Sequence, residues 1–358
     1  MRLLTAGKLL GWVGVVLTLA AIPLSLSTAK TLHVPSEYAF IFEAVDSASF
    51  GDTVLVAPGT YCRERNKILD TNRWIVMKDG VTLISEGGPE VTTLVETSHE
   101  TLNTVVHCES VLDARVSGFT ITTGECLANG SLQALNTAVY LQSSDVIVED
   151  NIIYYCWYAV DVYGESPRAR SPVIRDNEIR DCMTGVQVED VLRPYSPLIQ
   201  GNSIRNCIWG IWSRDSNAHI VGNVITGHTE DGIYFDGYSE SLMQANTIVG
   251  NGKHGVYAEM DYIYQSPCLN CTFELEMANN VYGNGWYDVY YIESTGLGLF
   301  MAIYNYWGTL CPDPSRFYGR IDVSVWTDST HTVICTDCEN CYHSTEPTTW
   351  GKIKAMFR

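Results

Sequence analysis

The sequence predicts an all-β protein built as a right-handed parallel β-helix, and two repeating features predict it. An Asn-x-(Ile/Val) signature recurs, and short alternating strand-like stretches broken by Gly, Asn, Asp and Ser fill the intervals between its copies. The copies begin at Asn151, Asn177, Asn202, Asn223, Asn246, Asn279 and Asn305, the last reading Asn-Tyr-Trp. Their spacings of 26, 25, 21, 23, 33 and 26 residues fit one coil of a β-solenoid.

The repeated asparagine has a structural explanation. A single coil cannot bury its own inward face, so coils stack with strands about 4.8 Å apart, and inward Ile and Val side chains form the core. A buried amide at a corner can pair with the amide of the next coil, so a column of asparagines satisfies itself. We therefore expect these asparagines to hold the stack rather than to act on a substrate.

The chain is predicted to have three parts. Residues 1–29 read as a cleaved signal peptide, because Arg2 and Lys8 accompany an uncharged apolar run that small residues follow; an uncleaved anchor helix is the alternative. Residues 30–328 form the β-helix domain, and residues 329–358 form a Cys-containing C-terminal tail. No other segment is long and apolar enough to cross a membrane, so we expect a secreted, periplasmic or cell-surface protein.

A short capping helix is predicted at the start of the domain. Residues 36–47 can form an amphipathic helix with Ile41, Ala44 and Val45 on one face. Such a helix would cover the first coil, where unpaired strands otherwise invite aggregation.

The charge balance excludes one class of partner and disfavours another. The chain has 22 basic and 41 acidic residues, and removal of the two basic residues in the leader leaves 20 against 41, or −21. Nucleic acid needs a basic footprint, so it is excluded as a partner. A polyanionic sugar is disfavoured unless cations bridge the charges. We therefore predict no cofactor, with Ca²⁺ entering only if the substrate is anionic.

Four segments resemble a known superfamily. The stretch Thr31–Tyr61 resembles the opening of secreted β-helix proteins of the pectin-lyase-like superfamily, and Gly80–Leu94 and Gly118–Gly124 resemble the coils that follow it. The sequence NYWGT at Asn305–Thr309 resembles a motif near the end of such helices. The resemblance covers Thr31 to Asp328 and implies the fold. It leaves the activity open, because the superfamily holds polysaccharide lyases, glycoside hydrolases, epimerases, periplasmic copper-assembly proteins and members without known activity.

One outward column of side chains is predicted to bind a substrate. The five signatures from Asn151 to Asn246 are each followed by a Gly or Ala and a β-branched residue, and alternation along that strand places the next residue outward. The column contains Tyr140, Asp161, Gln187, Trp212, Tyr234 and Tyr257. Its rings at Tyr140, Trp212, Tyr234 and Tyr257 could form a platform for sugar rings. The alternative is that Tyr and Trp simply favour strands and pack across them.

A second outward column supplies candidate catalytic groups. It contains Gln142, Tyr163, Glu189, Arg214, Asp236 and Glu259. Coil spacing puts Asp236 and Glu259 about 5 Å apart and Glu189 and Asp236 about 10 Å apart, which are separations that glycoside cleavage uses. Arg214 could lower the pKa of one acid or hold a substrate carboxylate, and Asp161 would lie at the groove's edge. The alternative is a solvated face on an acidic protein; His228 and Asp231 are explained by a turn.

The cysteines fall into two groups. Cys156, Cys182 and Cys207 each lie five residues after a signature asparagine, so they stack in one column and are expected to be buried thiols rather than disulfides or a metal site. The other group is Cys268, Cys271, Cys311, Cys335, Cys338 and Cys341. In an exported chain we expect these to form disulfides, with zinc as the alternative.

Three functional hypotheses follow. The first is a secreted β-helix protein that binds a polysaccharide along an exposed strand groove and, if it is an enzyme, cleaves it as a lyase or glycoside hydrolase. The second is a non-catalytic structural or adhesion protein of the cell surface or envelope, whose insertions at 164–172, 191–197 and 261–271 contact a partner. The third is periplasmic metal handling, although no cluster of His and Met is visible.

Overall fold

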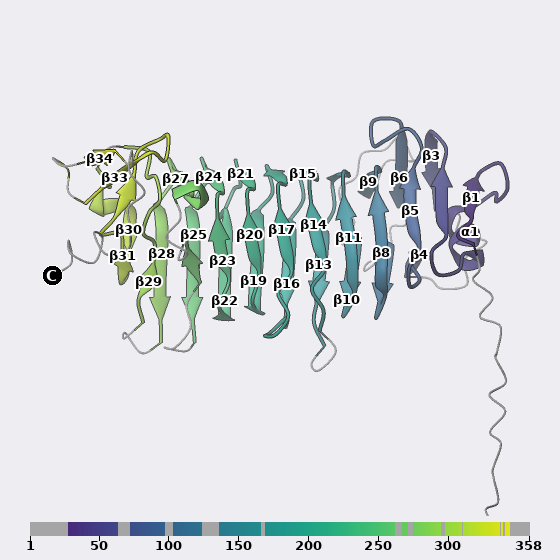
Figure 1. The fold of residues 1–358 in the computed structure, drawn as a ribbon, viewed down its shortest axis with the longest axis horizontal. Helices are drawn as coiled ribbons and strands as arrows, with labels where there is room; N and C mark the ends of the chain where they lie inside the picture. Colours follow the sequence, from purple (N-terminus) through teal and green to yellow (C-terminus); the bar gives the residue numbers. More distant parts are fainter. Residues whose placement is uncertain are drawn as a thin grey trace, which may run out of the picture.

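The computed structural model describes residues 28–63, 72–96, 103–123, 136–165, 169–261, 267–270, 275–294, 298–309, 311–336, 338 and 341–343. Over these ranges the chain is an all-β, right-handed parallel β-helix with one α-helix, which confirms the predicted fold class. The coils stack side by side along the long axis, from α1 at one end to β34 at the other (Figure 1). Nearly all of the predicted leader and the end of the tail lie outside the described residues. None of the described helices is long and apolar enough to span a membrane.

Three long parallel sheets form the faces of the helix, and each complete coil, from β2 to β28, contributes one strand to each sheet. The twelve-stranded sheet contains β1 (Thr31–Val34), β2 (Thr53–Val56), β5 (Thr82–Ser85), β8 (Leu112–Ser117), β11 (Asp145–Glu149), β14 (Val173–Arg175), β17 (Leu198–Gln200), β20 (His219–Val221), β23 (Leu242–Gln244), β26 (Cys268–Leu269), β29 (Phe300–Met301) and β31 (Ile321–Asp322). The ten-stranded sheet contains β4 (Arg73–Val76), β7 (Thr104–Glu109), β10 (Thr137–Gln142), β13 (Tyr158–Tyr163), β16 (Thr184–Glu189), β19 (Trp209–Ser216), β22 (Ile233–Ser239), β25 (His254–Met260), β28 (Tyr287–Glu293) and β30 (Phe317–Tyr318). The nine-stranded sheet contains β3 (Gly59–Cys62), β6 (Thr92–Glu96), β9 (Thr120–Thr123), β12 (Ile152–Tyr154), β15 (Glu178–Arg180), β18 (Ser203–Arg205), β21 (Val224–Thr226), β24 (Thr247–Val249) and β27 (Asn280–Tyr282).

The capping helix forms at the predicted end but is shorter than predicted. Helix α1 spans Ile41–Ser47 and buries Ile41, Ala44 and Val45 against the first coils. The segment before it is a turn, because the backbone N–H groups of Glu37 and Tyr38 donate to the carbonyl of His33. That turn starts where the sequence suggested a helix, so the helix begins five residues later than expected.

The signature asparagines form a continuous buried ladder, as predicted. Nδ2 of each donates to Oδ1 of the next, at 3.1 Å from Asn151 to Asn177, 3.0 Å to Asn202, 3.0 Å to Asn223, 3.0 Å to Asn246, 2.9 Å to Asn279 and 2.9 Å to Asn305. Each Oδ1 also accepts the backbone N–H of the preceding asparagine. Because every amide in the column has partners, the burial of seven stacked polar corners is compensated.

A second buried column lies at the next corner of each coil. It begins with the thiols of Cys156, Cys182 and Cys207 and continues with His228, Asn251 and Asn284. The backbone N–H of Cys207 donates to Nδ1 of His228 at 3.1 Å, and that of His228 donates to Oδ1 of Asn251 at 3.2 Å. The column thus changes from apolar thiols to hydrogen-bonded side chains toward the C-terminal coils, where the outer face carries most of its aromatic residues.

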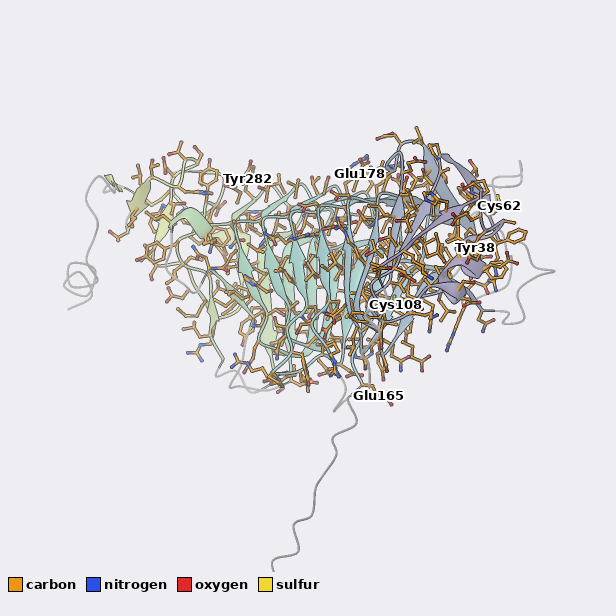
Figure 2. All side chains as sticks on the ribbon, turned by 45° about the vertical axis from the view of Figure 1, so that its right-hand side comes forward. Tyr38, Cys62, Cys108, Glu165, Glu178 and Tyr282 are labelled. Carbon is orange, nitrogen blue, oxygen red and sulfur yellow. A yellow bond between two sulfur atoms is a disulfide. The ribbon has the colours of Figure 1, made fainter. Side chains whose placement is uncertain are left out.

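The interior of the coils is filled by a continuous hydrophobic core. The residue two places after each signature asparagine is fully buried, as at Ile153, Ile179, Ile204 and Ile225. Figure 2 shows Cys108 within the coils, whereas Glu178 and Tyr282 lie on the outside of the nine-stranded sheet. The core therefore fills the inside of the solenoid. On all three sheets, the side chains that do not enter this core lie on the outer face.

A small antiparallel sheet follows the last coils. It contains β32 (Trp326–Thr327), β33 (Val333–Cys335) and β34 (Cys341–His343), and two short 3₁₀ helices, Leu275–Met277 and Pro314–Arg316, precede it. Cys311 and Cys338 form a disulfide with a Cα–Cα distance of 5.3 Å. Cys268 and Cys335 are also disulfide-bonded, as is Cys62 at the other end of the chain. Cys271 and the side chain of Cys341 lie outside the described residues.

Candidate functional site

The ten-stranded sheet carries both predicted outward columns on its outer face. Along the first, the register pairs Tyr140 with Asp161, Asp161 with Gln187, Gln187 with Trp212, Trp212 with Tyr234 and Tyr234 with Tyr257. The column continues to His107 on β7, and to Tyr290 and Tyr318 on β28 and β30. The second brings Glu189, Arg214, Asp236 and Glu259 onto four successive strands. The register is thus as the sequence indicated, while the roles of these residues stay predictions.

The tyrosines of the first column stack on one another, which changes how they could meet a ligand. Ring centroids are 4.9 Å apart from Tyr234 to Tyr257, 5.0 Å from Tyr257 to Tyr290 and 4.5 Å from Tyr290 to Tyr318, with interplanar angles of 2°, 5° and 6°. Because neighbouring coils cover both faces of the inner rings, these tyrosines present edges and hydroxyls outward. A sugar ring cannot lie flat on them, so the expected platform is instead a row of phenol edges.

Tryptophans border this tyrosine row. Trp212 meets Tyr234 edge-on, at 5.5 Å and 73°, and is tilted by 53° against Trp209. Trp286, just before β28, has 60% of its surface exposed. The indoles therefore break the parallel stack, and the Trp286 indole is largely open to solvent.

The acid column is partly neutralised by Arg214. Nη1 of Arg214 lies 3.4 Å from Oε1 of Glu189, and its Nε lies 4.0 Å from Oδ2 of Asp236. Burial raises the pKa of Asp236, the Glu259 charge adds to the rise, and Arg214 opposes it. Glu259 is exposed and accepts a 3.0 Å hydrogen bond from the hydroxyl of Tyr257. The column is an open charged row rather than a closed cleft around two carboxylates.

Asp161 has the environment of a protonated acid. Burial, and then the charge of Glu189, raises the pKa of Asp161 to about 7. Asp161 and Asp236, whose pKa values are both raised, lie three strands apart on β13 and β22, or about 14 Å at the usual strand spacing. That separation exceeds the range over which two carboxylates act together on one glycosidic bond.

A further polar pair, of which the sequence singled out Asp231 but not His254, lies beside the tyrosine row. Nδ1 of His254 lies 2.6 Å from Oδ1 of Asp231, and the same oxygen accepts the backbone N–H of His254 at 3.1 Å. Both side chains are nearly fully buried. Nε2 of His254 is buried too, and none of the described residues hydrogen-bonds to it. A histidine held at one nitrogen and unpaired at the other can accept or donate one hydrogen bond to a ligand.

His254 forms the floor of what we call the aromatic pocket, a hollow of about 590 Å³. Its lining comprises Trp209, Glu230, Asp231, Tyr234, Lys253, His254, Tyr257, Trp286, Tyr287, Tyr290 and Tyr318. The His254 ring lies 5.0 Å from that of Tyr290 and 5.6 Å from that of Trp286. Lys253 pairs with Glu230 and lies 5.3 Å above the Trp286 ring. The pocket thus combines apolar walls with a few fixed polar groups, the usual composition of a small-ligand site.

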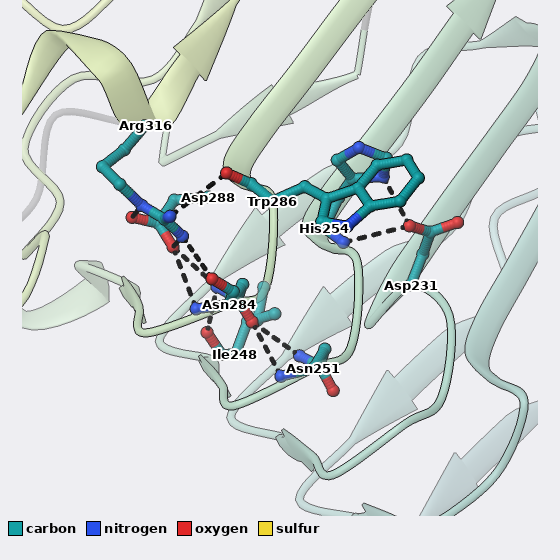
Figure 3. A network of polar contacts seen from close by, with 8 residues as sticks. All are labelled: Asp231, Ile248, Asn251, His254, Asn284, Trp286, Asp288 and Arg316. Atoms are coloured by element: carbon teal, nitrogen blue, oxygen red, sulfur yellow. Dashed lines mark hydrogen bonds and ion pairs between the residues drawn. The ribbon is translucent and has the colours of Figure 1, made fainter.

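A buried polar network supports the wall of this pocket (Figure 3). Arg316 donates to both carboxylate oxygens of Asp288, at 3.2 and 3.1 Å, and to the carbonyl of Trp286 at 3.1 Å. Asp288 accepts from Nδ2 of Asn284 at 2.9 Å, and Asn251 donates to Oδ1 of Asn284 at 3.0 Å. The backbone that carries Trp286 is therefore tied to the second buried column.

Sequence reasoning missed His254 because strand alternation fails at a corner. Counting back from the inward Val256 places Gly255 outward and His254 inward. In the structure alternation fails at the start of β25, where His254, Gly255 and Val256 are all buried, and the His254 ring packs against the outward rings of Tyr257 and Tyr290. The signal that could have found it is the repeat itself, since Trp209, Asp231 and His254 each stand immediately before the same Gly.

The described residues do not fit a metal site. No three side chains of His, Cys, Asp or Glu among them gather as ligands. The stacked thiols are engaged instead with backbone carbonyls, at 3.3 Å for Cys156, 3.2 Å for Cys182 and 3.5 Å for Cys207. Burial raises the pKa of the Cys182 thiol well above its ordinary value, which disfavours the thiolate that a metal needs.

Two of the predicted insertions contact each other and their neighbours. The backbone N–H of Ser196 donates to the hydroxyl of Ser171 at 3.0 Å, and Arg193 pairs with Glu240. The third insertion, 261–271, lies mostly outside the described residues, including its stretch 262–264.

Comparison with known proteins places these features in a family. The family model described as "Periplasmic copper-binding protein (NosD)" matches residues 64–308. The A-module of the Azotobacter vinelandii mannuronan C-5 epimerase AlgE4 is similar in structure, with a TM-score of 0.50 and 14% identity over 74% of this chain and 69% of that one. The AlgE6 A-module of the same organism has a TM-score of 0.45 and 14% identity, over 73% of this chain and 74% of that one. The catalytic domain of a GH87 α-1,3-glucanase has a TM-score of 0.37 and 9% identity, over 76% of this chain and 57% of that one. No curated protein sequence matches. At such identities the structural likeness shows the fold alone.

Proposed function

The chain belongs to the NosD family of periplasmic copper-binding proteins, and we propose that it is an extracytoplasmic β-helix protein that binds a polysaccharide at its aromatic pocket. The family description is the support for a location outside the cytoplasm. Because the described donor groups do not fit copper, the metal has no part in the proposal.

One observation carries the proposal: an exposed indole and a buried, unpaired imidazole nitrogen face the same hollow. A sugar ring has an apolar face and polar edges. The Trp286 face can cover the former, while Nε2 of His254 and the phenol hydroxyls of the tyrosine row can bond to the latter. The hollow opens along the ten-stranded sheet, so a longer chain can continue across Trp212 and its neighbours.

The charges favour a neutral sugar chain. The open row beside the pocket includes Asp236 and Glu259, and the whole chain has a formal net charge of −19. A uronate polymer would be repelled unless Ca²⁺ bridged it to these carboxylates.

Binding is supported better than cleavage. Glu189 and Asp236 lie beside Arg214, and Glu259 is open to solvent. Asp161 and Asp236, the two acids with a raised pKa, lie too far apart to act on one bond. The alternative hypothesis, a non-catalytic surface or envelope protein, also predicts an open, dispersed row of acids. Binding without turnover is therefore consistent with the proposed function and with that alternative.

The test is binding of a panel of neutral oligosaccharides, measured by calorimetry, to the protein and to Trp286→Ala. We expect at least one member to bind and the variant to weaken it about tenfold, the effect of about 1.4 kcal/mol. Phe50→Ala is the matched control, because Phe50 is equally exposed, at 68%, but lies at the opposite end of the helix. No binding across the panel, or equal losses in both variants, would overturn the proposal.

A further inference from the structure

A second pocket lies on the same sheet, toward the N-terminal end. It has a volume of about 430 Å³, and its lining comprises Asn72, Arg73, Thr104, His107, Thr137, Tyr140, Trp157, Tyr158 and Asp161. Asp161 on β13 and His254 on β25 are separated by four strand steps, or about 19 Å. The two hollows share no lining residue, so this is a separate site, which we call the Asp161 pocket.

Aromatic rings wall the Asp161 pocket. Tyr140 stands beside Asp161 in the register and stacks on His107 with ring centroids 5.2 Å apart. Trp157 and Tyr158 meet edge to face at 6.4 Å, at the start of the strand that carries Asp161. The carboxylate therefore lies among ring faces and edges rather than in open solvent.

The Asp161 carboxylate has no counter-ion or hydrogen-bond donor among the residues that the structure describes. Its partner in the register on the next coil is Gln187, and Gln187 donates instead to Glu189 at 3.3 Å. The guanidinium in the pocket, that of Arg73, lies 3.1 Å from Oε2 of Glu109.

Both acids near Asp161 already have a cation, since Arg214 lies 3.4 Å from Glu189 and Arg73 lies 3.1 Å from Glu109. In the register Glu189 on β16 is opposite Tyr163, two residues after Asp161, and Glu109 on β7 is opposite Gln142, two residues after Tyr140. His107 lies 3.6 Å from Glu109, and Arg73 balances one of these acids. Burial, and then Glu189, raises the pKa of Asp161 to about 7, which is the direction expected of a carboxylate that lacks a cation.

We propose that the Asp161 pocket is a second ligand site that binds an ammonium group, as carried by an amino sugar. A cation would pair with the Asp161 carboxylate, whereas Glu189 and Glu109 already have Arg214 and Arg73 as partners, and aromatic walls attract a desolvated ammonium through their ring faces. An anionic group would be repelled by the carboxylate, and a neutral group could donate a hydrogen bond to it but would not compensate its charge.

An amino-sugar ligand extends the proposed function. It rests on that function in one respect, namely that the ammonium group belongs to a glycan. If one chain occupies both pockets, it crosses Gln187 and Trp212 and carries an amino sugar at one end of its footprint. The two pockets can still be tested separately, because a disaccharide is too short to span both.

The experiment compares the disaccharide of glucosamine with the same disaccharide fully N-acetylated, by calorimetry at pH 7. We expect the amine form to bind at least about tenfold more tightly, and Asp161→Asn to remove that preference. Asp176→Asn is the control for net charge, since Asp176 is an exposed acid away from this sheet. Trp286→Ala should leave the preference for the amine intact.

Equal affinity for the two disaccharides, or an unchanged preference in Asp161→Asn, would overturn the inference. Loss of neutral-sugar binding in Trp286→Ala together with such a result would leave the proposed function standing. Conversely, an amine preference that depends on Asp161 without any neutral-sugar binding would support this site and overturn the other.

Discussion

Asp231 and His254 come from neighbouring coils and meet through a 2.6 Å contact between Oδ1 and Nδ1. The same carboxylate oxygen accepts the backbone N–H of His254, so one side chain fixes both the ring and the main chain at the edge of β25. With the hydrogen on Nδ1, Nε2 keeps a lone pair directed away from Asp231. The pair is therefore both a support of the coil and the polar floor of the aromatic pocket.

Replacing Asp231 with Ala should lower the free energy of unfolding by about 2–3 kcal/mol, because a buried imidazole and a buried backbone N–H lose their acceptor. Asp231→Asn keeps an acceptor oxygen and should lose less than half as much. Urea unfolding followed by circular dichroism measures both. Glu230→Gln, which removes the neighbouring acid of the Lys253 pair, should change stability by less than about 1 kcal/mol. Equal losses in the Ala and Asn variants would contradict the assigned contact.

Arg316 is expected to act as a positioning residue for Trp286. Arg316→Met should lower the free energy of unfolding by about 3 kcal/mol, since Asp288 is almost fully buried and would lose its cation. The released carbonyl of Trp286 should also let the indole move, which a shift of tryptophan fluorescence in Trp209→Phe and Trp212→Phe backgrounds would report.

Removing both charges of the pair provides the control. In the double variant Arg316→Met with Asp288→Asn, the buried charge is absent, so most of the stability should return while the fluorescence change persists. If fluorescence recovers together with stability, Arg316 supports the fold and does not position the indole.

The repeat determines how much could be predicted. Asn-x-(Ile/Val) sets the register of consecutive coils, so the asparagine ladder from Asn151 to Asn305 and the columns through Trp212 and Asp236 could be read before any coordinates. Ring orientation could not be read this way, because it depends on how each tyrosine packs on its neighbours. Strand alternation predicts on which side of the sheet a side chain lies. Whether the flat face of its ring is open depends on ring stacking, such as that of Tyr234 on Tyr257 at 4.9 Å.

The site itself was predicted only in part, for a related reason. Residues within a strand obey the period of two, but His254 stands at the corner where the period breaks. The environment of Asp161 also depends on three-dimensional neighbours, since its register partner Gln187 could have paired with it but bonds to Glu189 instead. The sequence repeat predicts where side chains lie along the sheet. The protonation and hydrogen-bond partners of a side chain depend on its contacts in three dimensions.

The stacked thiols should be unreactive in the folded protein. Cys182 is buried, its Sγ donates to the carbonyl of Arg180 at 3.2 Å, and burial raises the pKa of its thiol, so thiolate is scarce. Titration with Ellman's reagent should count one thiol fewer in Cys182→Ala than in the original chain under denaturing conditions, and the same number under native conditions. A native count that falls by one would show that the column is accessible.

The protonation of Asp161 should make stability fall as the pH rises. The folded state holds a proton on Asp161 up to about pH 7, whereas the unfolded chain releases it near the ordinary value of 3.8. Between these values the folded state binds more protons, so the contribution of this group decreases from pH 4 to pH 7 and is constant above. The full decrease is at most about 4 kcal/mol, because each pH unit corresponds to about 1.4 kcal/mol.

The asparagine side chain in Asp161→Asn cannot ionise, so this variant should not lose stability between pH 4 and pH 7 through this position. The variant should therefore match the original chain near pH 4 and be more stable than it at pH 8, as measured by urea unfolding at both values. Asp236→Asn should show a smaller effect in the same direction, because burial raises the pKa of Asp236 while Arg214 partly compensates its charge. An Asp161→Asn variant that gains nothing at pH 8 would mean that the carboxylate is already paired in the folded protein, and the case for an ammonium ligand would lose its main support.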